Sequence, residues 1–367
     1  MDLGRIERLR TSIEMRAADV AVISPGPNLR YLADMDINPY ERTFMLFISK
    51  TDMAFVLPIL EEEKVSRAVG GAGVPIFAYR DEEGPIGTIR SALKAVKADP
   101  SEKRLCLCTE QLHMRVKEFL MLKTLAGDFT YKNADSMMLG LRIIKDKEEF
   151  ERLRNAAEIV DIGIKAARAA IKPGVTEKKV AKAIEDAMLE AGADSVPFNA
   201  VLSGPRAALP HGDTSDRVIL DDEFVLCDIG AVYKGYYGDI TRTIPVGRPP
   251  DKMIQAYEAV YEANIAARDA VKPGITSEAL DAICRDIISS KGFGDFFIHR
   301  TGHGIGLEVH EEPYIVKGDP SRIIPGMAFT IEPGVYIPGL GGVRIEDDVL
   351  IGSRKAEVIT KSPRYMR

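Results

Sequence analysis

An internal repeat in the second half of the chain restricts its fold more than any other feature. Residues 169–188, AAIKPGVTEKKVAKAIEDAM, resemble residues 269–288, DAVKPGITSEALDAICRDII, at an offset of 100 residues. In each copy a helical pattern stops at Lys-Pro-Gly, and a threonine then stands where it can cap the next helix. Two structurally related halves are therefore expected in this part of the chain.

Each copy of the repeat is followed by one histidine and then by two acids. The histidines lie 37 and 36 residues after the glycine of Lys-Pro-Gly, and the acids occupy strand–turn–strand patterns with Gly or Pro between them. The first half contributes His211, Asp228 and Asp239, and the second half contributes His310, Glu332 and Glu346. We expect both halves to present these groups to a shared pseudo-twofold cleft, which the additional His303 makes asymmetric.

Five of the side chains in this region are of types that bind divalent metal ions: Asp228, Asp239, His303, Glu332 and Glu346. Charged residues are almost never fully buried unless they are paired or bound to a metal. A single catalytic zinc usually takes three protein ligands, whereas two divalent ions with bridging carboxylates use all five. Such a pair lowers the pKa of a bridging water, which yields a metal-bridging hydroxide near neutral pH. The pattern predicts a two-metal hydrolytic site.

The first part of the chain reads as a mixed α/β domain, because strand-like and helical patterns alternate along it. ADVAVIS, PIFAYRD and RLCLCTE are typical of strands, and RTFMLFIS with DMAFVLPIL predicts a hairpin around the turn at 50–52. The helical patterns include IGTIRSALKAVKA and a segment that ends at Gly127. We expect an N-terminal α/β domain at 1–138 and a catalytic domain at 139–367.

Composition is typical of a soluble globular protein and argues against nucleic-acid and membrane partners. Apolar residues make up 46% of the chain and charged residues 28%, with a net charge of −6 and no basic tract. No segment reaches the roughly 18 apolar residues of a membrane helix, and the charged N-terminus lacks the apolar centre of a signal peptide. The four cysteines have neither zinc-finger spacing nor a disulfide framework. We therefore expect a cytoplasmic protein with reduced thiols.

A family resemblance emerges from five segments taken in order: DIGA, GDITRT, GHGIGLEVHE, IEPGVYIP and GVRIEDDVL. They resemble the motifs of the pita-bread metallopeptidases, which include methionine aminopeptidase, aminopeptidase P and prolidase (Xaa-Pro dipeptidase). The N-terminal α/β domain is similar to that of the prolidase, aminopeptidase P and creatinase branch. The resemblance implies a two-domain α/β protein, with a creatinase-like N-terminal domain and a pseudo-twofold α+β pita-bread catalytic domain.

The same resemblance implies how the metal site is divided among its ligands. Asp228 would chelate one ion, Asp239 and Glu346 would bridge both, and His303 and Glu332 would bind the second. Mn²⁺ or Co²⁺ is the expected ion, with Zn²⁺ or Fe²⁺ as alternatives, because an oxygen-rich site of this kind accepts several divalent ions. A homodimer is also expected on the resemblance alone.

Three catalytic roles follow from the resemblance. Glu332 would take a proton from the attacking water. His211, in ALPHG, matches the histidine near the leaving group, and His310, in VHEEP, matches the one that holds the substrate carbonyl or the intermediate.

The resemblance points to peptides with a prolyl bond as substrates, most closely to dipeptides. An Xaa-Pro bond is a tertiary amide with restricted geometry, and its hydrolysis needs an apolar pocket for the ring and a cation for the free carboxylate. Phe198 and Leu209 are candidates for the pocket. Arg344 is a candidate for the carboxylate, or else it forms a salt bridge that orients neighbouring acids. Tyr314 stands where several prolidases carry a carboxylate-binding arginine, so aminopeptidase P activity on longer Xaa-Pro peptides is the close alternative.

Three alternatives to a dipeptidase therefore stay open. The first is an aminopeptidase P that acts on longer Xaa-Pro peptides. The second is a non-peptidase of the same fold, such as a creatinase-like C–N hydrolase or a dimethylsulfoniopropionate lyase. The third is a binding module without turnover, which the complete ligand set disfavours.

Overall fold

We analysed a computed structural model of the chain, which describes residues 1–71, 73–127 and 129–364. The chain divides into two compact units, Met1–Arg142 and Ile143–Arg367. The boundary expected at 138/139 is wrong by four residues, because it falls inside helix α6 (Asp135–Arg142). Met138 of this helix is buried, and Arg142 donates a hydrogen bond of 2.8 Å to Asn28 of the first unit. No helix among the described residues combines the length and apolar character needed to cross a bilayer.

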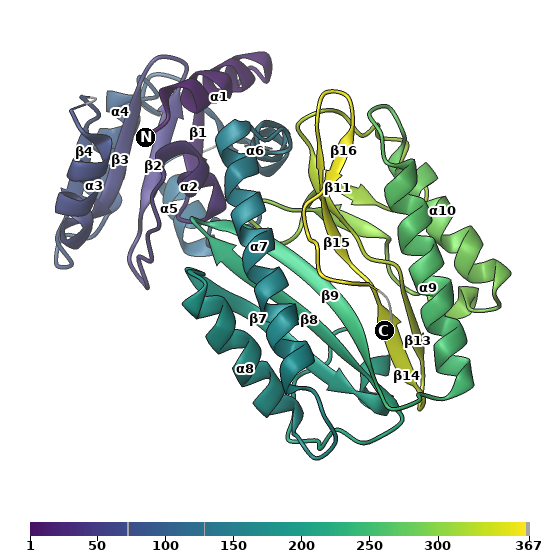
Figure 1. The fold of residues 1–367 in the computed structure, drawn as a ribbon. Helices are drawn as coiled ribbons and strands as arrows, with labels where there is room; N and C mark the ends of the chain where they lie inside the picture. Colours follow the sequence, from purple (N-terminus) through teal and green to yellow (C-terminus); the bar gives the residue numbers. More distant parts are fainter. Residues whose placement is uncertain (72, 128, 365–367) are drawn as a thin grey trace. The chain divides into compact units, whose positions relative to one another are not determined.

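The first unit is a mixed sheet flanked by helices, which agrees with the expected α/β domain (Figure 1). The sheet has the order β4-β3-β2-β1-β5-β6, in which β1 pairs antiparallel with β2 and parallel with β5. Its strands are β1 (Val20–Ile23), β2 (Met45–Ser49), β3 (Met53–Pro58), β4 (Ile76–Tyr79), β5 (Cys106–Thr109) and β6 (Thr130–Asn133). The remaining helices are α1 (Leu3–Met15), α2 (Pro27–Ala33), α3 (Glu62–Val69), α4 (Ile86–Ala95) and α5 (Val116–Ala126). The predicted hairpin is the β2–β3 pair.

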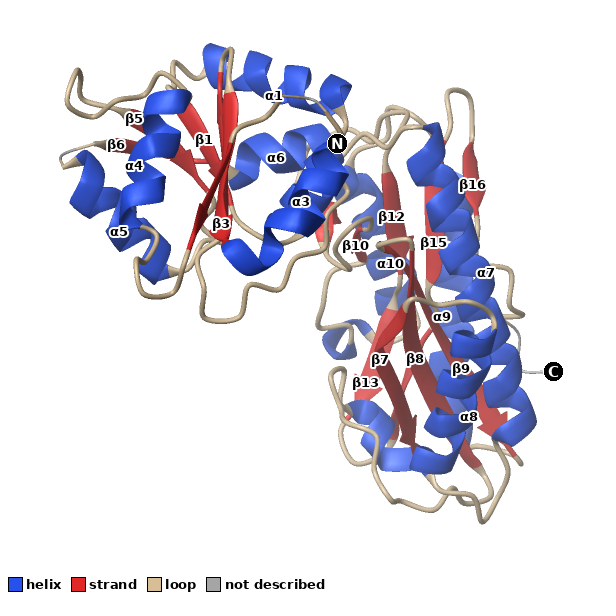
Figure 2. Cartoon of the chain, turned by 90° about the vertical axis from the view of Figure 1, so that its left-hand side faces the viewer, coloured by secondary structure: helices blue, strands red, loops and turns tan. Residues whose placement is uncertain are grey.

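The first half of the second unit is an antiparallel sheet of the order β7-β8-β9, covered by two helices. The helices are α7 (Lys147–Ala170) and α8 (Glu177–Glu190), and the strands are β7 (Ser195–Ser203), β8 (Glu223–Tyr233) and β9 (Tyr236–Val246). Figure 2 shows the helices layered against the long strands of this unit. Apolar side chains of the helices and strands, among them Val160, Ile184 and Ile229, form the core between the two layers.

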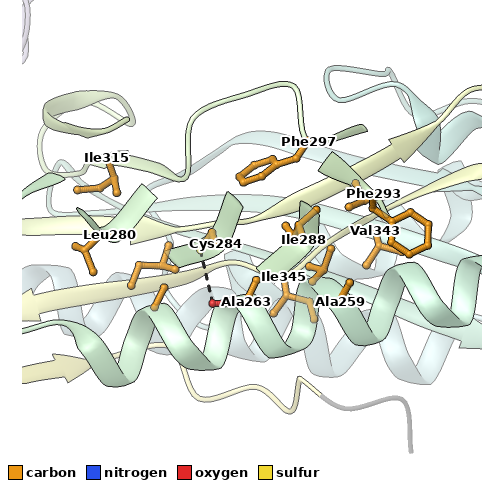
Figure 3. Packing of buried hydrophobic residues seen from close by; sticks show 14 of the residues in the cluster. Ala259, Ala263, Leu280, Cys284, Ile288, Phe293, Phe297, Ile315, Val343 and Ile345 are labelled. Carbon is orange, nitrogen blue, oxygen red and sulfur yellow. Dashed lines mark hydrogen bonds between the residues drawn. The ribbon is translucent and has the colours of Figure 1, made fainter. Parts of the chain in front are cut away.

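The second half repeats the pattern of two helices over strands. The helices are α9 (Asp251–Ala270) and α10 (Ser277–Ser290). The strands are β10 (Gly302–Gly304), β11 (Glu311–Ile315), β12 (Ala328–Ile331), β13 (Gly334–Ile337), β14 (Gly341–Arg344), β15 (Asp347–Ile351) and β16 (Ala356–Val358). Figure 3 shows the core of this half, where Cys284 of α10 packs beside Ala263 of α9 and its thiol donates to the Ala263 carbonyl at 3.6 Å. All four cysteines are free.

Equivalent contacts in the two halves confirm the repeat. Thr176 caps α8 and Thr276 caps α10, each by accepting a hydrogen bond of 3.3 Å from the backbone N–H three residues on. The glycines in the turns between the paired helices have positive φ angles, 87° at Gly174 and 95° at Gly274. Glycine adopts this conformation without the steric cost that a side chain would add. The sequence similarity therefore reflects one helix–turn–helix geometry used twice.

Candidate metal centre

The first pair of acids lies on one face of the β8–β9 ladder. Asp228 pairs with Thr241 and Gly230 pairs with Asp239 in the antiparallel register. Because side chains alternate between the faces of a strand, Asp228, Asp239 and Thr241 point the same way. Cys227 points to the opposite face and is buried in the core beneath the helices. The alternation thus separates the acidic face from the apolar face of this sheet.

The second pair of acids flanks a strand pair in the other half. Glu332 directly follows β12 and Glu346 directly precedes β15, whose terminal residues Ile331 and Asp347 face each other. The Glu346 N–H donates to the Thr241 carbonyl at 3.1 Å. This bond fastens the second half to β9, so the two pairs of acids meet.

His303 completes the cluster from the short strand β10. Its Nε2 lies 3.3 Å from Glu332 Oε1 and 3.8 Å from Asp239 Oδ2. Its Nδ1 lies 3.1 Å from the Gly304 carbonyl, an acceptor that selects the tautomer with a free Nε2. Potential ligand atoms of Asp239, His303 and Glu346 all lie within 4.8 Å of one another.

The electrostatics of the cluster fit a cation. Burial raises the pKa values of Asp239 and Glu346 well above normal, and neighbouring carboxylates raise them further. Burial also raises the pKa of Glu332 to about 7, and it lowers that of His303 to about 3. Asp239 Oδ1 is buried without a hydrogen-bond partner among the described residues. Four closely spaced carboxylates and a neutral imidazole, with one carboxylate oxygen lacking a hydrogen-bond partner among the described residues, form a donor set suited to divalent ions.

Arg344 is held by the site itself. It donates to Asp228 Oδ2, to Thr241 Oγ1 at 2.9 Å and to the Tyr336 hydroxyl at 2.7 Å. The residue as a whole is 5% exposed. Of the two roles considered for Arg344, these contacts correspond to the salt bridge that orients acids.

His299 lines the site through a contact that the sequence pattern did not indicate. Its Nε2 lies 3.0 Å from the Tyr336 hydroxyl, and burial lowers its pKa to about 3. A neutral imidazole is thereby linked through Tyr336 to Arg344 and Asp228. The sequence signal was weak, since a histidine four residues before His303 is as compatible with a structural role.

A cavity of about 830 Å³ opens over the cluster, within the range typical of small-ligand sites. All five predicted metal-binding residues line it. Other lining residues include Phe198, His211, His299, Arg300, His310 and Arg344. His310 packs edge-on against His303, with ring centroids 4.2 Å apart. Leu209 is 53% exposed and does not belong to the lining, so its predicted place in the pocket is wrong.

Comparisons with known proteins agree with this geometry. Residues 151–353 match the model of metallopeptidase family M24, and residues 5–144 match that of the creatinase/prolidase N-terminal domain. An uncharacterized peptidase from Staphylococcus haemolyticus is 35% identical over 98% of this chain and 99% of its own.

Two further relatives carry functional names. An Xaa-Pro dipeptidase from Pyrococcus furiosus is 48% identical over 237 residues, covering 64% of this chain and 68% of its own. A solved Xaa-Pro dipeptidase from Bacillus anthracis superimposes with a TM-score of 0.90 at 37% identity, covering 99% of both chains. The full-length match and the buried donor set lead to one conclusion: the chain belongs to metallopeptidase family M24, with a creatinase/prolidase N-terminal domain ahead of the peptidase domain.

Proposed function

We propose that this protein is a dinuclear-metal-dependent peptidase that hydrolyses Xaa-Pro dipeptides. The observation that carries the proposal is the convergence of four carboxylates and one imidazole at a single cavity of about 830 Å³. The likeness to Xaa-Pro dipeptidases over nearly the whole chain supports this substrate class. A cavity of that volume suits a small peptide.

Asp228, Asp239, His303, Glu332 and Glu346 would hold the two metal ions. Two ions, when bound, would supply a Lewis acid for the scissile carbonyl and a water of lowered pKa. We propose Mn²⁺ or Co²⁺, because carboxylate-rich sites with one imidazole suit such ions.

The protein's own side chains would orient the substrate and move protons. Glu332 accepts the proton of the attacking water. His310 stands half-exposed beside His303, and burial lowers its pKa, so at neutral pH its uncharged ring can donate a hydrogen bond to the substrate carbonyl. His211 lies on the cavity wall, where it can serve the leaving group. Phe198 contributes an apolar surface for the proline ring.

One observation favours aminopeptidase P activity as the second candidate. Tyr314, rather than an arginine, follows the His-Glu-Glu-Pro segment. A neutral residue there removes one cation that would select a free carboxylate at the end of a dipeptide.

A substrate panel tests the proposal. After chelation and reloading with manganese or cobalt, the protein is assayed on Met-Pro, Xaa-Pro-Yaa peptides, creatine and dimethylsulfoniopropionate. We expect metal-dependent release of proline from Met-Pro. Cleavage of the longer peptides alone would support an aminopeptidase P, and turnover of creatine or dimethylsulfoniopropionate alone would rule out both peptidases. A chain that binds no metal and hydrolyses nothing would support a binding module.

We further propose a homodimer located in the cytoplasm. Val116 and Leu120 are 74% and 52% exposed and lie one turn apart on α5, an apolar surface suited to a contact between subunits. The four free cysteines suit a reducing compartment. Sedimentation as a monomer at micromolar concentration would contradict the dimer, and recovery outside the cytoplasm in cell fractions would contradict the location.

A further inference from the structure

Among the described residues, the cavity wall carries two arginine side chains, those of Arg344 and Arg300, which are always positively charged. A dipeptide substrate brings a free carboxylate that needs a cation in this cavity. Arg344 is already bound to Asp228, Thr241 and Tyr336, so a substrate carboxylate would have to compete with these groups. Arg300 is the remaining candidate.

Arg300 is not bound by an acid among the described residues, although its positive charge acts on Glu332. Within residues 1–71, 73–127 and 129–364, its guanidinium forms no ion pair and no side-chain hydrogen bond. Its Cζ atom lies 4.4 Å from the centroid of the Tyr314 ring, over the ring face. A guanidinium stacked on an aromatic ring is oriented by it, and its N–H edge stays available for a planar anion.

The backbone around Arg300 is tied to the metal centre. Its carbonyl lies 2.7 Å from His299 Nδ1, and the next residue, Thr301, accepts a hydrogen bond of 2.7 Å from the Glu332 N–H. Tyr314 lies on β11, opposite His303 of β10. Both members of the Arg300–Tyr314 stack are thus anchored next to proposed metal ligands.

From this arrangement we propose that Arg300 binds the C-terminal carboxylate of the dipeptide and that Tyr314 positions its guanidinium. The inference rests on the proposed function and names the residue that recognises the C-terminal end of the substrate. Tyr314 takes the position where several prolidases place an arginine. In this chain its ring instead stacks against Arg300, which lies just before β10. An Arg–carboxylate pair is bidentate and charge-assisted, which favours a free carboxylate over an amide. Arg300 is therefore the residue that selects dipeptides over longer Xaa-Pro peptides.

The test compares Met-Pro with its C-terminal amide, Met-Pro-NH₂, on metal-loaded wild type and Arg300→Ala. In wild type we expect kcat/KM to favour the free acid. In Arg300→Ala the ratio of the two kcat/KM values should fall by on the order of tenfold to hundredfold, mainly through the KM of Met-Pro. Defects of folding or metal loading lower both activities together and leave the ratio unchanged.

Four further variants sharpen the test. Arg300→Lys should retain part of the ratio, because it keeps the charge without the bidentate geometry. Tyr314→Phe should keep the wild-type ratio because it preserves the ring face, and Tyr314→Leu should lower the ratio by about twofold to fivefold. Arg354→Ala, at an exposed arginine of the same unit outside the cavity, is the matched control.

The outcomes separate the inference from the proposed function. A wild-type protein that hydrolyses neither compound overturns the proposed function and this inference with it. A wild type that hydrolyses Met-Pro, combined with an unchanged ratio in Arg300→Ala, overturns only the assignment of Arg300. A selective loss of Met-Pro turnover in Arg300→Ala supports both.

Discussion

Neutralising Glu332 should stabilise the metal-free protein and weaken the metal-loaded one. In the metal-free site, burial raises the pKa of this carboxyl from 4.5 to about 7, although Arg344 opposes the rise. Below pH 4.5 the group is protonated in both folded and unfolded chains. Between 4.5 and about 7 the unfolded chain releases the proton while the folded chain keeps it, so folding stability falls as pH rises.

The size of the effect follows from that pKa difference. A rise from 4.5 to about 7 corresponds to about 3 kcal/mol of folding free energy above pH 7. Glu332→Gln has nearly the same shape and no charge. Metal-free Glu332→Gln should therefore exceed metal-free wild type in unfolding free energy by up to about 3 kcal/mol at pH 8, with little difference at pH 4.5.

The assay is urea unfolding of chelated wild type and Glu332→Gln between pH 4.5 and 8, repeated with saturating manganese. The difference between the two proteins cancels the contributions of shared titrating groups that do not interact with Glu332. His303, 3.3 Å from Glu332 Oε1, and Glu346, whose pKa Glu332 raises, contribute to the measured difference. With metal the order should reverse, because the variant lacks an anionic ligand. A metal-free variant that is less stable than wild type at pH 8, or a difference independent of pH, would refute the reasoning.

Three other perturbations probe the site and its support. His303→Ala or Glu332→Ala should abolish hydrolysis with the circular dichroism spectrum preserved, and near-wild-type turnover in either variant would contradict the proposed ligands. Lys145→Met should cost about 3–5 kcal/mol in urea unfolding, because it removes the cation paired with Glu311, whose Oε2 lies 2.9 Å from Lys145 Nζ with both side chains at most 2% exposed. Adding Glu311→Gln should recover part of that loss, and no recovery would count against a buried charge as the cause. Gly238→Ala should lower unfolding free energy by about 1–3 kcal/mol, since the new Cβ would lie 2.6 Å from the Ala156 carbonyl carbon of α7; wild-type stability would contradict the close approach.

Local patterns in the sequence were reliable where short-range physics controls the structure. The threonine caps, the β2–β3 hairpin and the helix that ends before Gly127 depend on residues within a few positions of one another. The domain boundary was misplaced because no local signal separates 138 from 142, and only the packing of α6 in the first unit assigns it. Leu209 was misplaced for a related reason, since an apolar residue in a turn carries no sign of whether it faces solvent.

The sequence by itself determined the repeat, the residue types of the metal centre and the family, because these depend on identity and spacing along the chain. Only the tertiary structure decided which partner each charge has. It directs Arg344 to Asp228 and Tyr336, brings His299 to Tyr336, and stacks Arg300 on Tyr314. Such contacts join residues 8 to 116 positions apart. Their energies depend on distance and burial, which only the folded arrangement of the strands specifies.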